Sequence, residues 1–371
     1  MRAVQELVRR GADPGPARAL GAPLVPTPTT FHAHATLAGH TRSVSGIAFH
    51  RRDAAICATV GEDGALRVHR EVARGEWDLG VSFRCHDASA GGVASLAWSP
   101  AGSDAIVTAG ADGRCCVWRL PKTRKGPSAV MECGAPVAGA CWSPDDGRVF
   151  AACGPSILVF DAAAGEQTGQ MRRWGEEPGA RDRTTGCAHA RRGTVLASTG
   201  AGEGAVTLWD TTAAMCLGAM FGGEGDVAVA PVTSSNPNRG GVVSRGASFS
   251  PDDRRLATCD SLGWVRVWDV ANRARVTSWR AHRGGGVADC AFSPDGAWIA
   301  TASADGTVRL WDPSDGRELA CLGDGRESSF SAVAFAPTGA LLAAATITSR
   351  EELLHSRGYN VGVLLEGKYG V

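Results

Sequence analysis

The sequence predicts an all-β protein that is built from repeated copies of one four-strand unit. Three observations carry this prediction: one complete unit in residues 281–312, looser copies of it along the rest of the chain, and the absence of helix-period stretches between them. Within the complete unit, short apolar runs are bounded by Pro, Asp and Gly, which is the pattern of short antiparallel strands. We therefore expect strands and turns along most of the chain.

The complete unit begins at Ala281 with a His-containing turn and an apolar run that ends at Phe292, followed by Ser-Pro-Asp-Gly. A strand of small residues, 300–303, comes next and leads into an Asp-Gly turn. The alternating strand 307–311 then ends in Trp and is closed by Asp312.

The aromatic residue that ends this last strand, or a substitute for it, recurs along the chain. It stands at His69, Trp118, Phe160, Trp209, Trp268 and Trp311. The intervals are 49, 42, 49, 59 and 43 residues, and they surround the period of roughly 40 to 45 residues that is typical of WD40 blades.

The chain resembles the WD40-repeat family over about residues 30 to 370. Trp-Asp endings close 206–210, 265–269 and 308–312, and Gly39-His40 and Ala281-His282 precede two of the units. Ser-Pro-Asp turns begin at Ser143, Ser250 and Ser293. The resemblance implies a β-propeller, in which each repeat forms one blade.

Closure of the ring follows from counting strands. Six units end at the aromatic positions, and a seventh contains Phe330–Phe335, Leu341–Ile347 and Asn360–Leu365 but lacks a fourth strand. One spare strand, Thr30–Leu37, precedes the first unit. In propellers of this family the first strand commonly completes the last blade, which removes an open sheet edge. We therefore expect a seven-bladed propeller over residues 30–371, closed by its N-terminal strand.

Residues 1–29 differ in composition from the rest and predict a flexible N-terminal extension. The stretch Val4–Leu24 resembles part of an ankyrin repeat. A single partial copy cannot bury its apolar face, because such repeats stabilise one another by stacking.

The composition limits the kinds of binding partner and the cellular location that we expect. The 38 basic and 38 acidic residues balance, so no global field attracts nucleic acid. The sequence has no apolar span long enough to predict membrane insertion, and no secretory segment is visible in it. We therefore expect an intracellular protein, either cytoplasmic or nuclear. The 12 cysteines form no CxxC pair, so we expect buried thiols and no metal site, disulfide framework or cofactor.

The family resemblance implies a hydrogen-bonded structural tetrad of His, Ser/Thr, Asp and Trp within a blade. The matching residues are His40, Thr59, Asp63, His86, Thr108, Asp112, Trp118, His282, Thr301, Asp305 and Trp311. His69 replaces Trp in the first unit. Although His, a hydroxyl and Asp also make hydrolase triads, a repeated set that ends in a Trp donor is typical of a satisfied buried network. We expect no catalytic residues and no enzyme activity.

Three units depart from the tetrad pattern. The fifth keeps Thr258 and Trp268 but has Leu262 at the Asp position, and the third has Gly154 and Phe160. We expect the third and fourth units to depend on packing alone.

The longest loops are predicted on one face, called the top face. They are His86–Gly92, Arg172–Arg183, Gly222–Val242 and Thr348–Tyr359. The opposite face is predicted to have short loops apart from Arg70–Asp78 and the basic run Lys122–Lys125. Long loops on a rigid scaffold often carry function, and Trp and Arg are typical interface anchors. The predicted partner-binding residues are Glu62, Arg172, Arg173, Trp174, Arg183, Arg245 and Tyr359.

These observations predict a non-enzymatic scaffold that binds protein or peptide partners through its top face. Two alternatives remain open. The insert in the last unit is similar to that of the mitotic-checkpoint and mRNA-export propellers, which implies binding of a short helical motif. A ubiquitin-ligase substrate receptor would instead carry Arg two residues after Trp-Asp, where this chain has Thr212, Ala271 and Ser314.

Overall fold

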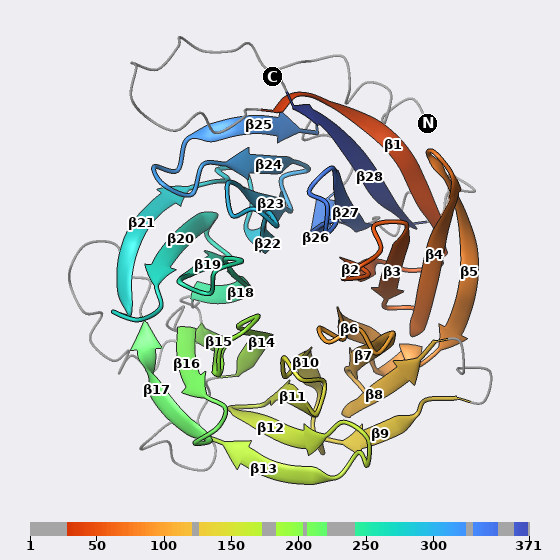
Figure 1. Cartoon of the computed structure of the whole chain (residues 1–371), viewed down its shortest axis with the longest axis vertical. Coiled ribbons are helices and arrows are strands. Elements are labelled where there is room, and N and C mark those ends of the chain that lie inside the picture. The colour runs from red at the N-terminus through yellow and green to blue at the C-terminus, as the bar shows by residue number, and fades with distance from the viewer. Residues whose placement is uncertain are drawn as a thin grey trace.

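The computed structural model describes residues 28–120, 126–172, 183–202, 206–220, 242–323, 329–347 and 360–369. Over these ranges the chain forms 28 β-strands and one 3-10 turn, Ala88–Ala90. The strands are arranged as twisted sheets around a central axis, which makes the molecule a β-propeller (Figure 1). The prediction of an all-β propeller is confirmed.

Each sheet is formed by strands that follow one another in the chain, with the closing sheet as the exception. The strands before the eight-stranded sheet are β1 (Pro28–His40), β2 (Val44–Phe49), β3 (Ile56–Gly61), β4 (Ala65–Ala73), β5 (Glu76–Arg84), β6 (Val93–Trp98), β7 (Ala105–Gly110), β8 (Arg114–Arg119), β9 (Ala129–Glu132), β10 (Val137–Trp142), β11 (Arg148–Cys153), β12 (Ser156–Asp161) and β13 (Gln167–Met171). The eight-stranded sheet contains β14 (Thr184–His189), β15 (Val195–Gly202), β16 (Val206–Asp210), β17 (Met215–Met220), β18 (Val242–Phe249), β19 (Arg255–Asp260), β20 (Trp264–Asp269) and β21 (Ala274–Arg280). The remaining strands are β22 (Val287–Phe292), β23 (Ile299–Ser303), β24 (Val308–Trp311), β25 (Glu318–Leu322), β26 (Ser329–Phe335), β27 (Leu341–Ile347) and β28 (Asn360–Tyr369).

The described strands hydrogen bond into six sheets, so the predicted count of seven separate blades is wrong. Five sheets have four strands each, and the sixth has eight. The eight-stranded sheet arises because β15 continues past its own neighbours and pairs with the start of β18. In that pairing Ala201 lies opposite Val243, and Gly202 lies opposite Val242. Two repeats are thereby joined into one double-width blade.

The ring is closed by β1, which pairs antiparallel with β28 from Pro28 opposite Tyr369 to His40 opposite Asn360. The order in this sheet is β1-β28-β27-β26, so strands from both ends of the described chain share it (Figure 1). Completion of the last sheet by the N-terminal strand is therefore present as predicted. Both strands are longer than the sequence pattern indicated, and each therefore covers more of the edge of its neighbour.

Packing between adjacent sheets supplies the core. The cluster between the β6–β9 and β10–β13 sheets contains Val117, Trp142 and Phe160, each at most 3% exposed. Burial of such side chains contributes roughly 1.5–3 kcal/mol each. Indole groups also connect the sheets: Trp98 Nε1 donates to Ala48 O at 3.1 Å, and Trp142 Nε1 donates to Ala97 O at 3.0 Å.

The segment Arg70–Asp78, which the sequence predicted to be a long loop, forms most of a β-hairpin instead. Arg70 pairs with Asp78 and Glu71 pairs with Trp77, and Gly75 turns with φ +80°. The Trp77 ring packs edge-on against Phe49 at 6.4 Å, so burial of one aromatic side chain extends the strands through a polar sequence. The basic run at 122–125 lies outside the described residues.

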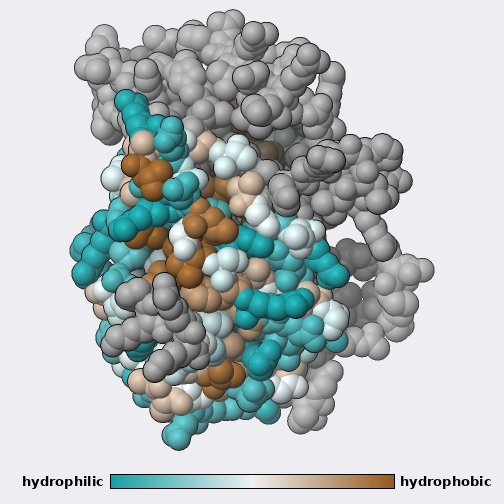
Figure 2. Space-filling model, turned by 90° about the vertical axis from the view of Figure 1, so that its right-hand side faces the viewer, coloured by the Kyte–Doolittle hydropathy of each residue, from teal (hydrophilic) through white to brown (hydrophobic). Residues whose placement is uncertain are grey.

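The outer strands present a mixed surface to solvent. Figure 2 shows scattered apolar residues among polar ones on the side of the molecule where β5 lies in Figure 1. Val72 and Leu79 of the β4–β5 hairpin are 58% and 48% exposed. Isolated exposed apolar side chains are normal on soluble folds and do not by themselves mark a site.

Candidate binding face and central channel

Two kinds of loop share the top face, as repeated backbone hydrogen bonds between them show. Loops that follow second strands provide the acceptors, Gly64 O and Gly263 O. Loops that join consecutive repeats provide the donors, with Cys85 N at 2.8 Å and His282 N at 3.1 Å. On the opposite face, Val270 N donates to Arg254 O at 2.9 Å. This bond joins the turn after a first strand, β18, to the turn after a third strand, β20. The structure thus separates the loops as the sequence predicted.

The structure describes only part of the predicted partner-binding set. Glu62 and Arg183 are exposed on top-face loops, and Arg172, just after β13, is also exposed. Arg245 belongs to β18, but its side chain lies outside the described part of the structure. Arg173, Trp174 and Tyr359 lie outside the described residues, as do most of the long top-face loops.

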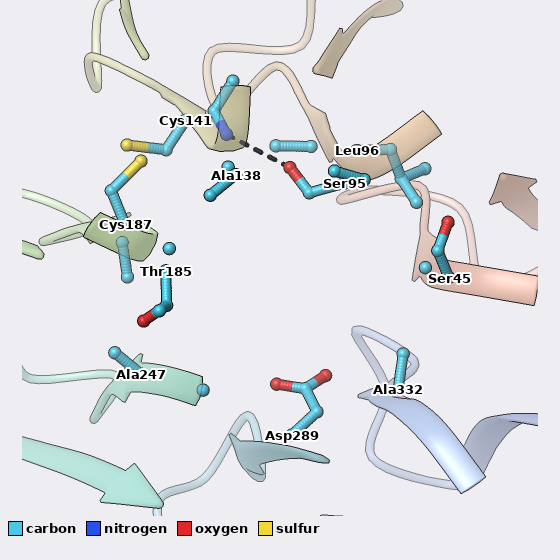
Figure 3. Close-up of a pocket in the computed structure, with 18 of the residues that line it drawn as sticks. Ser45, Ser95, Leu96, Ala138, Cys141, Thr185, Cys187, Ala247, Asp289 and Ala332 are labelled. Atoms are coloured by element: carbon cyan, nitrogen blue, oxygen red, sulfur yellow. Dashed lines mark hydrogen bonds between the residues drawn. The ribbon is translucent and has the colours of Figure 1, made fainter. Parts of the chain in front are cut away.

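The innermost strands surround a central cavity of about 810 Å³ (Figure 3). Its lining is dominated by small side chains, among them Gly46, Ala138, Gly186, Ala247 and Ala332. Small residues leave the axis of the propeller open, because a larger side chain at these positions would fill the space. Arg183 and Asp289 are the charged residues among those that line it. Arg183 therefore belongs to both the top face and the channel wall, whereas Glu62 does not line the channel.

Asp289 is the residue of the channel that sequence reasoning missed. Its side chain points into the cavity (Figure 3). One carboxylate oxygen accepts a hydrogen bond from Cys290 N at 2.8 Å, and the other accepts one from Val333 N at 3.1 Å. Burial raises the pKa of Asp289 to about 6, although both backbone donors favour the charged form. The sequence does contain a signal for this residue, because Asp289 is a carboxylate in the middle of β22, an otherwise apolar strand.

Polar side chains of the channel wall also join neighbouring sheets. Asp289 of β22 accepts from Val333 of β26, and Ser95 Oγ of β6 accepts from Ala140 N of β10 at 3.1 Å (Figure 3). The hydroxyl of Ser331 donates to Val44 O across the junction between β26 and β2. These side chains supply inter-sheet hydrogen bonds at positions where the backbones of adjacent sheets do not pair.

Replacing Asp289 by Asn is expected to change how stability depends on pH. The folded pKa of about 6 lies above the ordinary value of 3.8, so the wild-type protein loses stability as pH rises from about 4 through 6. The Asn variant lacks this loss. Relative to wild type, its free energy of unfolding should therefore rise by roughly 1–3 kcal/mol between pH 4.5 and 7.5.

Urea unfolding at the two pH values measures this difference. Asp78→Asn, at an exposed carboxylate of β5, is the matched control and should show no such relative rise. Parallel pH dependence of Asp289→Asn and wild type would contradict the assignment.

The predicted tetrad residues lie within hydrogen-bonding distance of one another. In the β22–β25 sheet, His282 contacts Asp305 through Nδ1 at 2.8 Å and Thr301 through Nε2 at 2.7 Å. Trp311 Nε1 donates to Thr301 Oγ1 at 2.9 Å. In the β6–β9 sheet, His86, Thr108, Asp112 and Trp118 repeat these contacts at 2.9, 2.9 and 3.1 Å.

The β2–β5 sheet contains a variant of this network. His40 contacts Asp63 and Thr59, both at 2.9 Å, and His69 Nε2 lies 3.3 Å from the Thr59 hydroxyl in place of an indole. Burial, together with the charges of His40 and Arg67, lowers the pKa of His69 to about 4. His69 is therefore neutral at pH 7 and serves as a neutral hydrogen-bonding substitute for Trp.

The networks are buried, which opposes a catalytic interpretation. Thr301 and His282 are both 0% exposed, and Thr301 Oγ1 is already shared between His282 and Trp311. A nucleophile needs an accessible hydroxyl and a substrate position beside it. The geometry favours a structural role, in which each polar group is satisfied by another.

Two of the irregular units contain a hydrogen bond from a Trp indole to a Ser or Thr hydroxyl. Trp209 Nε1 donates to Ser198 Oγ at 2.8 Å, so the prediction that the fourth unit depends on packing alone is wrong. The fifth unit keeps the Trp268–Thr258 hydrogen bond at 2.8 Å. Loss of one tetrad member therefore does not remove the indole–hydroxyl link.

The fifth unit also contains a buried ion pair. Asp260 is 0% exposed and Arg266 is 5% exposed, and Arg266 Nη1 lies 2.6 Å from Asp260 Oδ2. The other carboxylate oxygen accepts from Leu262 N and Trp264 N. The sequence pattern did not predict this pair, because Asp260 stands two positions before Leu262, the residue at the tetrad Asp position.

Other chemistry is not apparent in the described part of the chain. All 12 cysteines are free thiols. The described residues contain no group of His, Cys, Asp or Glu that could hold a metal ion. Within the same ranges, no helix has the length and apolar character needed to cross a bilayer.

Parts of the chain match a known family. Four segments match the model described as WD domain, G-beta repeat: residues 31–70, 77–119, 232–269 and 273–312. The first two coincide with β1–β4 and β5–β8, and the last two end with β20 and β24. The matched segments include all three buried networks that contain a tetrad His.

Proposed function

This chain is a WD40-repeat β-propeller, and on that premise we propose that it is a non-enzymatic scaffold that binds protein or peptide partners through its top face. Its role is to hold such partners together in a multiprotein complex. Propellers with these repeats are typically interaction platforms, and a rigid ring with variable loops suits that task.

The observation that carries the proposal is the position of Arg183. Its side chain is exposed beside a long top-face loop, and it also lines the 810 Å³ channel that opens along the axis. Arg172, at the other end of the same loop, is exposed as well. Arg recognises carboxylates and backbone carbonyls through several donors and is frequent at interface hot spots.

The non-enzymatic part of the proposal is supported by the state of the candidate catalytic groups. The hydroxyls of Thr59, Thr108 and Thr301 are at most 1% exposed and are bonded to His. The carboxylate that faces the channel, Asp289, accepts its two hydrogen bonds from the backbone N–H groups of Cys290 and Val333. Acid–base chemistry requires converging groups in one accessible site.

Affinity purification of the intact chain tests the proposal. Arg172→Glu with Arg183→Glu should remove or reduce at least one partner more than tenfold, because the variant reverses two charges on the proposed face. The matched control, Arg254→Glu with Arg317→Glu, makes the same charge change in exposed turns between β18 and β19 and between β24 and β25. An unchanged partner set in the top-face variant, with loss in the control, would refute the choice of face.

A further inference from the structure

Three pairs of cysteine thiols approach each other in the described part of the chain: Cys115–Cys133, Cys141–Cys187 and Cys259–Cys290. Only in the pair Cys141–Cys187 do both residues line the central cavity. Figure 3 shows their sulfur atoms facing each other, one from β10 and the other from β14. This pair combines mutual contact with a position in the wall of the central cavity.

The strands that carry the two thiols are packed closely together. A Cβ atom added at Gly139 of β10 would lie 3.1 Å from Gly186 Cα and 3.3 Å from Cys187 N. Cys187 also packs against the apolar cluster that contains Cys141. A disulfide requires Cα atoms about 4.4–6.8 Å apart with side chains directed toward each other. Because Gly139 and Gly186 have no side chains, the backbones of β10 and β14 pack closely beside the two thiols.

We propose that Cys141 and Cys187 form a reversible disulfide when the protein meets a hydroperoxide, which makes the channel wall an oxidation site. The inference does not depend on partner binding.

Cys187 is the thiol that reacts first. Cys187 lines the cavity and is a partly exposed residue, whereas Cys141 is 8% exposed. Contact with the Cys187 thiol and burial raise the pKa of Cys141 well above its usual range, so Cys141 stays protonated until its partner is oxidised. The pair Cys259–Cys290, which does not line the cavity, serves as a control. Contact with Cys259 and burial raise the pKa of Cys290 in the same way.

The chemistry balances with hydrogen peroxide as the oxidant. The Cys187 thiolate attacks one peroxide oxygen, the O–O bond breaks, and a sulfenic acid and one water form with the proton that the thiol had released. The Cys141 sulfur then attacks the Cys187 sulfur, the S–O bond breaks, and the leaving hydroxide takes the Cys141 proton as a second water. Two thiols lose two electrons in total, and one peroxide is reduced to two waters.

The disulfide would join two different sheets. β10 belongs to the four-stranded β10–β13 sheet and β14 to the eight-stranded sheet. A cross-link between them constrains the unfolded chain and stabilises the folded one. Oxidised protein should therefore melt about 5 °C or more above reduced protein, and a dithiol reductant should reverse the change.

The test uses the full chain, reduced and then treated with hydrogen peroxide. Free thiols are capped with N-ethylmaleimide, and a non-reducing digest is analysed by mass spectrometry. The expected result is a cross-linked peptide containing Cys141 and Cys187, with Cys259 and Cys290 alkylated after denaturation. Cys141→Ser and Cys187→Ser should each abolish both the cross-link and the rise in melting temperature, and Cys290→Ser should keep both.

Two results would overturn the proposal. One is a folded, peroxide-treated protein in which Cys187 carries only sulfenic or sulfinic acid and no cross-link to Cys141. The other is equal oxidation of Cys259–Cys290, because both of those residues are at most 3% exposed and neither lines the channel. Circular dichroism after treatment establishes that the protein is still folded in either case.

Discussion

Replacing Asp260 by Asn is expected to lower the free energy of unfolding by about 3–5 kcal/mol, because it removes one charge of a buried ion pair and keeps the Arg266 guanidinium charged. Arg266 is 5% exposed and lies 2.6 Å from Asp260. Its escape to water is restricted by the strands on either side of β20, β19 and β21. Urea unfolding of the intact chain at pH 7 measures the loss.

A double-mutant cycle separates the ion pair from packing. Asp260→Asn combined with Arg266→Met removes both charges and keeps an apolar side chain of similar length, so the double variant should recover roughly half or more of the loss. Arg266→Lys, which retains a charge, provides a milder single change. A loss below about 1 kcal/mol for Asp260→Asn would show that Arg266 reaches solvent and that the pair contributes little.

Thr301→Val is expected to cost about 2–4 kcal/mol, the second largest effect. The variant keeps the shape of the side chain but removes the hydroxyl that Trp311 Nε1 donates to at 2.9 Å and that contacts His282 Nε2 at 2.7 Å. Two buried polar groups would then lack a partner, at about 1–3 kcal/mol each with partial relaxation. Thermal or urea unfolding reports the loss.

Comparison variants give this second prediction its specificity. Thr301→Ser retains the hydroxyl and should lose no more than about 1.5 kcal/mol, from one missing methyl group. Ser198→Ala strands only the Trp209 indole and should cost less than Thr301→Val. Equal losses for Thr301→Val and Thr301→Ser would assign the effect to packing and not to the hydrogen bonds.

The Thr301 network should also weaken in acid. Burial would raise the pKa of Asp305, but hydrogen bonds from His282 and Thr307 and the charge of His282 outweigh it and lower the pKa to about 2. A carboxyl with a lowered folded pKa stabilises the protein fully above its ordinary pKa near 4. This contribution is lost as pH falls from about 4 toward 2.

Much of the fold follows from local pattern. Turn residues at fixed offsets mark the strands, and the unmatched strand before His40 identifies how the last sheet is completed. The tetrad positions could be selected because Thr, Asp and Trp recur at constant spacing, as in Thr108, Asp112 and Trp118. Such features repeat along the chain, so one copy supports the interpretation of another.

Features that depend on tertiary pairing could not be predicted in the same way. The merger of two repeats rests on Ala201 and Gly202 meeting Val242 and Val243, which nothing in their local sequence requires. The sequence around Gly75 is polar enough to predict a loop. The structure has a hairpin there instead, because Trp77 packs against Phe49. Asp289 stands out in the sequence as a carboxylate in an apolar strand, but its place in the channel wall follows only when the innermost strands are arranged around one axis.

The pairing of β1 with β28 has a consequence for synthesis on the ribosome. Pro28 lies opposite Tyr369, so the first strand is made early and finds its partner only when nearly all the described chain has been translated. Until then β1 presents free N–H and C=O groups, which favours capture by chaperones or by a second chain. The slowest step of folding should therefore be this final docking, because the contact joins the most distant parts of the described sequence.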